Sequence, residues 1–245
     1  MQGNEMGKSA KTPDHDDKLS FVEPGCAGIP ETLSGDYVIL IKGNSISRHG
    51  CSESTRKNLG WDRECGMAAS SEANDYVHLL AAAIQTTMPE RRVRIVFGKG
   101  GRPDLAVQTV GEEEKYRPDL IIVQDGEHSA SKAGIVTYEY DYDLLLGKLA
   151  AFPGNPELLA IGIWNPRCRE EFRRCTGRNY DLYAVEIARI QKRVAARHGA
   201  KFVDVSAYEN DPANTGSGLV AGVRWHPNDN GMRCYAEAAF AAFRS

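Results

Sequence analysis

The chain of 245 residues lacks several features that would place it in common functional classes. No apolar run approaches the ~20 residues that cross a bilayer, so we expect no membrane-spanning helix. Basic residues are not in excess, because 30 Lys and Arg stand against 33 Asp and Glu. A protein that binds nucleic acid needs a clustered basic face, so we expect no nucleic-acid partner. The length is sufficient to bury the core of one large domain.

Metal-binding patterns are also missing. The six cysteines include no Cys-x-x-Cys pair, which disfavours a zinc ribbon or a thioredoxin-like redox site. Cys51 with Cys65, or Cys168 with Cys175, are candidates for bridges between loops, and free thiols in a reducing cytosol fit equally well. The histidines are dispersed, and the Asp-His-Asp-Asp run at residues 14–17 fits a solvated tail better than a metal site. We therefore expect no metal ion and no organic cofactor.

The first 34 residues lack the order of a signal peptide, in which a cationic stretch precedes an apolar one. They are polar and are interrupted by glycine and proline. We expect residues 1–34 to form a flexible extension and residues 35–245 to form the folded domain. A cytoplasmic location is the default expectation, with export as the alternative if a signal was removed from a longer precursor.

From residue 36 onward, short apolar runs alternate with segments of helical periodicity. The runs are bounded by turn-forming residues, as expected for strands buried on both faces of a sheet. Strands separated by single helices favour a parallel sheet with helices on both faces, where functional residues collect at the carboxyl ends of the strands. The predicted strands cover residues 37–41, 93–97, 120–123, 158–164 and 201–205, and the predicted helices cover residues 76–84, 142–149, 183–194 and about 230–243.

A candidate nucleophile directly follows the first of these strands, in the segment Gly43-Asn44-Ser45. A catalytic serine needs its hydroxyl at a turn, where the oxygen faces a cleft and the N–H can meet an oxyanion. Gly43 permits such a tight turn. The same three residues also occur in plain structural turns, so the motif by itself leaves both interpretations open.

A candidate general base, His226, begins the segment that opens the last predicted helix. Pro227 favours an extended backbone at the histidine, and Asn228 or Asp229 can cap the helix. A loop that enters a helix leaves the imidazole free to turn toward a serine, and histidine is the usual proton acceptor for a serine hydroxyl. We therefore predict that His226 is the general base, with a plain helix-entry residue as the alternative.

These two segments resemble the first and last sequence blocks of SGNH/GDSL hydrolases. The first block is usually Gly-Asp-Ser, and a carbohydrate-active bacterial branch has Gly-Asn-Ser-Ile-Thr/Ser, which is similar to residues 43–47. The likeness continues through residues 60–61, 66–70 and 75–80 and covers about residues 36–243. It implies an α/β protein, a three-layer α/β/α sandwich with a parallel sheet (the flavodoxin-like SGNH hydrolase fold). It also implies a serine esterase that acts on small acyl esters, such as O-acetyl groups, of carbohydrates.

The resemblance further implies an oxyanion hole. The third family block is Gly-x-Asn-Asp, whose asparagine amide points to the oxyanion, and alignment from Pro118 places His128 at that position. An imidazole N–H can donate as an amide does, and a solvent-facing loop histidine is the alternative. The second block supplies a glycine N–H, for which Gly101 is the best candidate. We predict an oxyanion hole formed by Ser45, Gly101 and His128.

One departure from the family concerns the group that orients His226. The family pattern has an aspartate three residues before this histidine, where this chain has Val223. A backbone carbonyl, Asp229 or Asp204 is the alternative partner for the imidazole. We therefore predict a Ser–His dyad whose orienting group stays open.

Two functions are compatible with these features. The first is an esterase in which Ser45 attacks an ester carbonyl while His226 takes its proton, with a small-molecule or carbohydrate ester as substrate. The second is a carbohydrate-binding protein that has lost catalysis, as the altered positions Val223 and His128 indicate. His49, four residues after Ser45, is a candidate substrate contact or spare base, with a loop role as the alternative. Acyl chain length and oligomeric state stay open.

Overall fold

The computed structural model describes residues 21–22, 35–176, 179–216, 218 and 220–245. The predicted extension, residues 1–34, lies outside this part except for residues 21–22. The described strands form one sheet in the order β1-β3-β2-β4-β5-β6. Its strands are β1 (Phe21–Val22), β2 (Asp36–Gly43), β3 (Arg92–Phe97), β4 (Leu120–Gln124), β5 (Glu157–Ile161) and β6 (Lys201–Val203). All neighbours pair in parallel except β1, which runs antiparallel to β3.

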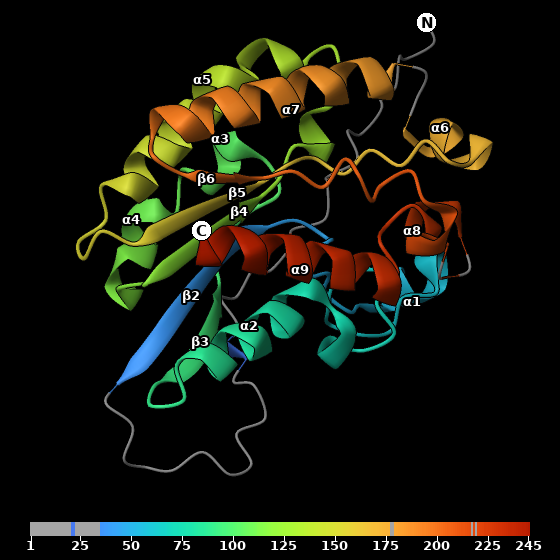
Figure 1. Cartoon of the computed structure of the whole chain (residues 1–245). Helices are drawn as coiled ribbons and strands as arrows, with labels where there is room; N and C mark the ends of the chain where they lie inside the picture. Colours follow the sequence, from blue (N-terminus) through green and yellow to red (C-terminus); the bar gives the residue numbers. More distant parts are fainter. Residues whose placement is uncertain (1–20, 23–34, 177–178, 217, 219) are drawn as a thin grey trace, which may run out of the picture.

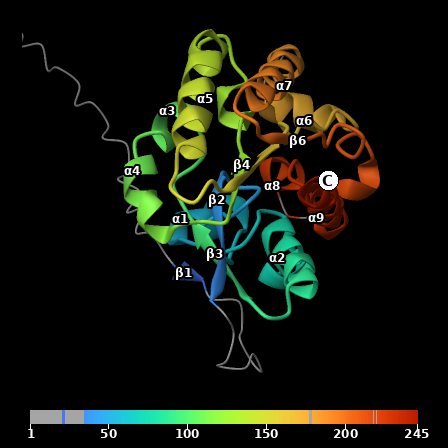
Figure 2. The same ribbon diagram turned by 60° about the vertical axis from the view of Figure 1, so that its left-hand side comes forward.

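Helices cover both faces of this sheet (Figure 1). On one face α5 (Gly134–Ala150) packs against α7 (Tyr180–Arg197) and against the short α3 (Pro103–Ala106). On the other face α2 (Tyr76–Thr87) packs against α9 (Asp229–Arg244). Figure 2 shows the same division from a second direction. The predicted three-layer α/β/α sandwich with a parallel sheet is confirmed.

The remaining helices are short and lie in the connections. The α-helices among them are α1 (Glu53–Leu59), α4 (Val110–Glu113), α6 (Glu170–Thr176) and α8 (Ala221–Arg224). The 3-10 helices are η1 (Glu72–Asn74), η2 (Glu114–Tyr116), η3 (Glu127–Ser129) and η4 (Pro212–Asn214). Two of these short helices carry residues of the candidate site. Helix η3 follows β4, and α8 lies between β6 and α9.

The predicted strands agree with the structure except at the ends of the last two, because β5 stops at Ile161 rather than at residue 164 and β6 stops at Val203 rather than at residue 205. The Gly162 N–H still donates to the Val203 carbonyl of β6 at 2.9 Å, and the next backbone N–H groups find side-chain partners. The Ile163 N–H donates to Gln191 Oε1 at 2.9 Å, and the Trp164 N–H donates to Glu127 Oε1 at 2.8 Å. The apolar run therefore continues past the strand, because these residues stay buried without pairing to a neighbouring strand.

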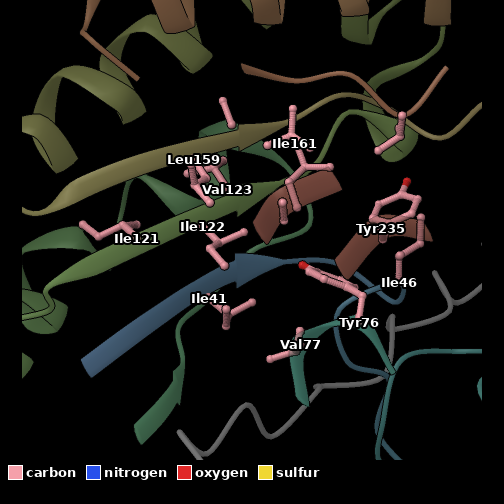
Figure 3. Packing of buried hydrophobic residues seen from close by; sticks show 14 of the residues in the cluster. Ile41, Ile46, Tyr76, Val77, Ile121, Ile122, Val123, Leu159, Ile161 and Tyr235 are labelled. Carbon is pink, nitrogen blue, oxygen red and sulfur yellow. The ribbon is translucent and has the colours of Figure 1, made fainter. Parts of the chain in front are cut away.

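The hydrophobic core on the α2 and α9 side extends to the residues around Ser45. The rings of Tyr76 and Tyr235, one from each helix, lie 5.5 Å apart, and Figure 3 shows both near Ile46. Ile46 is fully buried, and burial of such a side chain contributes about 1.5–3 kcal/mol. The hydroxyl groups of Tyr76 and Ser47 lie 2.6 Å apart. Core packing thus anchors the two residues that follow Ser45.

The cysteines that the structure describes as free include at least one partner of each bridge considered from the sequence. Cys51, Cys65, Cys168 and Cys234 are free thiols, so neither of the two bridges considered from the sequence is formed there. Within the described ranges, no helix combines the length and the apolar character needed to cross a bilayer.

Candidate active site

Ser45 lies in the turn that follows β2, and the side chain of Asn44 builds this turn. Asn44 Oδ1 accepts a hydrogen bond from the Ile46 N–H at 2.9 Å, and the Asn44 carbonyl accepts one from the Arg48 N–H at 3.0 Å. The carbonyl oxygen of Ser45 accepts a hydrogen bond from the Met67 N–H at 2.7 Å. The serine backbone is therefore held on both sides, while the residue itself is partly exposed.

His226, on the loop between α8 and α9, meets the serine hydroxyl. Its Nε2 lies 2.8 Å from Ser45 Oγ, although the two residues are 181 positions apart in the sequence. Its Nδ1 lies 2.8 Å from the carbonyl oxygen of Gly222. Because a carbonyl oxygen only accepts, Nδ1 carries the hydrogen and Nε2 presents its lone pair to the hydroxyl. This is the tautomer that a general base for Ser45 requires.

The Gly222 carbonyl is thus the partner of Nδ1, and neither candidate aspartate takes that place. Asp229 accepts hydrogen bonds from the N–H and the hydroxyl of Ser70, both at 2.6 Å. Asp204 Oδ1 accepts one from the Ser206 N–H at 2.9 Å. Of the three alternatives left open by the sequence, the backbone carbonyl is the one in contact with the imidazole.

The surroundings of His226 keep its imidazole neutral. Burial lowers the pKa of His226 to about 4, and the hydrogen bond to Gly222 only partly opposes this effect. Positive charge on His49 and His128 lowers the pKa further. A neutral imidazole is the form that can accept a proton, so the group is competent as a base over the whole neutral range.

The predicted oxyanion residues Gly101 and His128 are neighbours. A Cβ placed on Gly101 would lie 4.0 Å from His128 Cδ2, and the φ of Gly101 is +96°, in the region that favours glycine. His128 lies in η3 and is exposed at its surface. Partial desolvation and the positive charge of Arg102 and His49 lower its pKa. A neutral His128 retains one N–H donor.

Gly100, beside Gly101, explains how this loop approaches the serine turn. A Cβ on Gly100 would lie 2.1 Å from the carbonyl oxygen and 2.5 Å from the nitrogen of Gly43. Only glycine permits this contact between two backbones. The loop after β3 is therefore packed directly against the start of the turn that carries Ser45.

His49 lies in the electrostatic range of both His226 and His128, as its effect on their pKa values shows. Its Nδ1 lies 2.8 Å from the carbonyl oxygen of Gly50, and its own carbonyl accepts a hydrogen bond from Trp61 Nε1 at 3.3 Å. Its N–H donates to the Cys65 carbonyl at 2.9 Å. These bonds fit a loop residue at the border of the site.

Sequence reasoning missed Glu127, whose carboxyl group lies behind the serine turn. Its Oε2 accepts a hydrogen bond from Asn44 Nδ2, and its Oε1 accepts bonds from the Trp164 N–H at 2.8 Å and from Gln124 Nε2 at 3.1 Å. Burial raises the pKa of Glu127 to about 7. A sequence signal existed, because Glu127 immediately precedes the predicted oxyanion residue, but nothing in the sequence tied it to Asn44.

Among the described residues, no group of three or more His, Cys, Asp and Glu side chains is arranged to hold a metal ion.

The sequence matches no family model and no curated protein. Solved structures do match, and Axe2, an acetylxylan esterase from Geobacillus stearothermophilus, is one of them. It superposes with a TM-score of 0.56 over 86% of this chain and 95% of its own, at 19% identity. The chain has the fold of an SGNH hydrolase.

Other structures with the SGNH hydrolase fold agree. TesA matches with a TM-score of 0.55 at 14% identity, over 84% of this chain and 98% of its own. LAE5, an alpha/beta hydrolase enzyme from the metagenome of Lake Arreo, Spain, matches with a TM-score of 0.54 at 22% identity, over 87% and 97%. The fold predicted from the sequence blocks is therefore shared with these proteins, while identities this low carry the fold alone.

Proposed function

We propose that this protein is a serine esterase that hydrolyses small acyl esters through Ser45 and His226. Ser45 Oγ attacks the ester carbonyl while His226 Nε2 takes the hydroxyl proton. The tetrahedral intermediate then collapses, and the imidazolium returns the proton to the departing alcohol. Water, activated by the same imidazole, attacks the acyl group on Ser45. The acid leaves and the free serine is restored.

One observation carries this proposal: the contact of 2.8 Å between Ser45 Oγ and His226 Nε2, with Nδ1 held by Gly222. The serine hydroxyl, the imidazole and the carbonyl are hydrogen-bonded one to the next, as the nucleophile, the base and the orienting group are in serine hydrolases. Covalent catalysis by serine needs no further residue than these for proton transfer. The fold shared with known esterases supports the same chemistry.

The negative charge on the intermediate needs N–H donors. We assign this role to the Ser45 N–H, the Gly101 N–H and an imidazole N–H of His128. Gly101 and His128 lie together, and the Gly100 contact brings the loop that carries Gly101 to the serine turn. Removal of one such donor costs about 10²–10³ in kcat in other serine hydrolases.

For the substrate we propose a small acyl group, such as acetyl, on a carbohydrate. Axe2, with the same fold, is an acetylxylan esterase. The Gly-Asn-Ser-Ile-Ser block of residues 43–47 resembles the carbohydrate-active branch of the family. Both observations favour a sugar ester over a long-chain lipid ester.

The alternative is a carbohydrate-binding protein on the same scaffold that has lost catalysis. Its support was the valine in place of the family aspartate at position 223. The Gly222 carbonyl contacts the same imidazole nitrogen that this aspartate would hold, so the valine no longer favours the alternative. His128 in place of asparagine is the feature that still favours it.

The decisive experiment measures hydrolysis of p-nitrophenyl acetate by the wild type and by S45A. We expect S45A to lose on the order of 10⁴-fold or more in turnover while it unfolds at an unchanged temperature. S71A is the matched control, because the Ser71 hydroxyl makes no cap bond to its helix, and it should retain full activity. Turnover by S45A equal to that of the wild type would eliminate the mechanism.

Covalent labelling separates the esterase from the binding protein. A fluorophosphonate should modify Ser45 in the wild type and leave S45A and H226A unmodified, because only an activated serine reacts. EstA from Pseudoalteromonas sp., a psychrotrophic esterase with this fold, has been solved inhibited by monoethylphosphonate. Absence of labelling in the folded wild type would favour the binding protein. Release of acetate from acetylated xylo-oligosaccharides, compared with longer acyl esters, tests the substrate class.

A further inference from the structure

The side chain of Asn44 has a fixed orientation that spans Ser45. Its Oδ1 accepts the Ile46 N–H at 2.9 Å, so its amide nitrogen is the atom that faces Glu127. The amide oxygen thus accepts from a backbone N–H on one side, and the amide nitrogen donates to the Glu127 carboxylate on the other. Asn44 is 6% exposed, so water cannot easily replace either partner. The turn that carries the nucleophile therefore depends on which atom of residue 44 faces Glu127.

Glu127 in turn collects three N–H donors and offers only acceptors to them. Oε2 receives the Asn44 amide, and Oε1 receives the Trp164 N–H at 2.8 Å and Gln124 Nε2 at 3.1 Å. The two oxygens of a carboxylate can accept from all three donors. An amide at this position would place its own NH₂ group next to one of these N–H donors. Glu127 thus joins the end of β2, the end of β4 and the segment after β5.

Trp164 extends this connection to the base. Its indole Nε1–H donates to the Trp225 carbonyl at 2.8 Å, and its own carbonyl accepts a bond from the Tyr180 hydroxyl at 2.9 Å. The Trp225 ring meets the imidazole of His226 edge to face, with centroids 5.1 Å apart. Trp164 is fully buried. A continuous chain of contacts therefore links the serine turn to the histidine loop.

We propose that Asn44 and Glu127 are a positioning pair that holds Ser45 and, through Trp164, His226 at their reactive separation. The inference rests on the esterase function proposed above. Within the described part of the chain, no hydrogen bond joins the side chain of Asn44 or Glu127 to Ser45 Oγ or to the imidazole, so we treat neither as a catalytic residue. The imidazole has a single backbone carbonyl as its orienting partner, and the separation of the two groups depends on how two loops are held. A displacement of about 1 Å costs on the order of 10² in rate.

The polarity of this pair gives a specific test, because donor and acceptor can be exchanged. In N44D two carboxylates face each other and neither can donate a hydrogen bond. In E127Q the new amide has one oxygen instead of two, so it cannot accept from both the Asn44 amide and the Trp164 N–H as Glu127 does. In the double variant N44D/E127Q, the new carboxylate at position 44 accepts from the Ile46 N–H and from the new amide at position 127. The oxygen of that amide still accepts from the Trp164 N–H. We expect each single variant to lose about 10² in kcat with KM within about threefold of the wild type. The double variant should return to within about tenfold of wild-type kcat.

Two controls and a second readout complete the experiment. N58D and E237Q make the same chemical changes at the surface, where Asn58 and Glu237 are exposed, and should leave kcat unchanged. Thermal unfolding does not depend on ester turnover, and the double variant should unfold at a higher temperature than either single variant. If the wild type hydrolyses no ester, the proposed function fails, while the unfolding comparison still tests the pair.

A double variant whose kcat and unfolding temperature are no better than those of the worse single variant would overturn the proposal. If a single variant does not fold, the double variant alone decides the matter. A folded double variant with kcat within about tenfold of the wild type supports the pair. A double variant that is unfolded or inactive rejects it.

Discussion

His226 is oriented by the backbone carbonyl of Gly222. An aspartate at position 223, as the family has, is therefore not needed to hold the imidazole. Val223 occupies the position where the family has aspartate, yet it is 2% exposed and packs in the core. Its carbonyl accepts the His226 N–H at 3.0 Å, so its backbone is already part of the histidine loop. The bond from His226 Nδ1 to the Gly222 carbonyl thus orients the imidazole, while the buried Val223 side chain separately stabilises the same loop.

V223D tests whether the missing carboxylate limits catalysis. The Gly222 carbonyl already accepts from Nδ1, so we expect no gain in kcat. A carboxylate in this buried place has no partner, and the free energy of unfolding should fall by about 3 kcal/mol or more. Chemical denaturation and ester turnover measure the two effects. V223A, which removes packing without adding charge, is the control, and an increase in kcat for V223D would contradict the assignment of Gly222.

At the scale of elements, the end of β2 is attached to α4 by a buried ion pair. The ammonium group of Lys42 donates to Glu113, and both side chains are fully buried. Glu113 Oε1 also accepts the Lys99 N–H at 2.9 Å. The pair therefore connects the strand before Ser45 with the loop that carries Gly101.

K42M should be strongly destabilising, because it leaves the Glu113 carboxylate buried without its counter-charge. We expect a loss of about 3–5 kcal/mol in the free energy of unfolding, measured by denaturant titration. R189M is the matched control, since Arg189 and Glu186 form a surface pair that should contribute less than about 1 kcal/mol. Equal losses in the two variants would show that the buried pair contributes no more than a surface pair.

The contact between the loop after β3 and the serine turn is equally testable. In G100A the new methyl group would meet the Gly43 backbone, so the loop must move away from the turn. We expect kcat to fall by about 10²-fold, because the Gly101 donor moves with the loop. G111A, in nearby α4, is the control, since a Cβ there meets nothing within 4 Å. Wild-type activity in G100A would place the oxyanion donor elsewhere.

At the scale of the whole molecule, several carboxyl groups are buried near the carboxyl end of the sheet. Burial raises the pKa of Asp125 to about 6 and the pKa values of Glu127 and Glu209 to about 7. In the unfolded chain such groups ionise near pH 4. Between about pH 4 and 8 these groups therefore bind more protons in the folded protein, so their contribution to stability falls as pH rises through this window. The lowered pKa of His226 acts in the opposite sense, between about pH 4 and 6.5.

From about pH 6.5 to pH 8 the titration of these carboxyl groups outweighs the remaining titration of His226 in the unfolded chain, so we expect the unfolding temperature to fall over this range. A fall of about 2–4 °C corresponds to about 1 kcal/mol for a protein of this size. E209Q should reduce the effect, because an amide at position 209 does not titrate, while its oxygen can still accept the Asn165 N–H that Glu209 accepts at 3.0 Å. E237Q, at an exposed glutamate, should leave the pH dependence unchanged. Stability that rises with pH in both the wild type and E209Q would contradict this account.

The sequence by itself determined the layered architecture and the two residues of the candidate dyad. Strand and helix periodicities are local, because they reflect which faces are buried, and they placed β2 and α9 correctly. Ser45 and His226 were recognisable because the segments around them resemble two family blocks, which favoured the catalytic interpretation where the turn and the helix entry alone left a structural role open. The predicted roles of Gly101 and His128 in the oxyanion hole stay predictions, although the two residues do lie together.

Only the tertiary structure decided how these groups are held. Every residue has a backbone carbonyl, so no side-chain pattern distinguishes the Gly222 carbonyl that contacts His226. No sequence pattern indicated the role of Glu127 either, because two of its three donors, Asn44 and Trp164, lie far from it in the chain. The same holds for the end of β5, where buried N–H groups turn to side chains. Long-range packing, rather than local composition, sets the partner of each buried polar group.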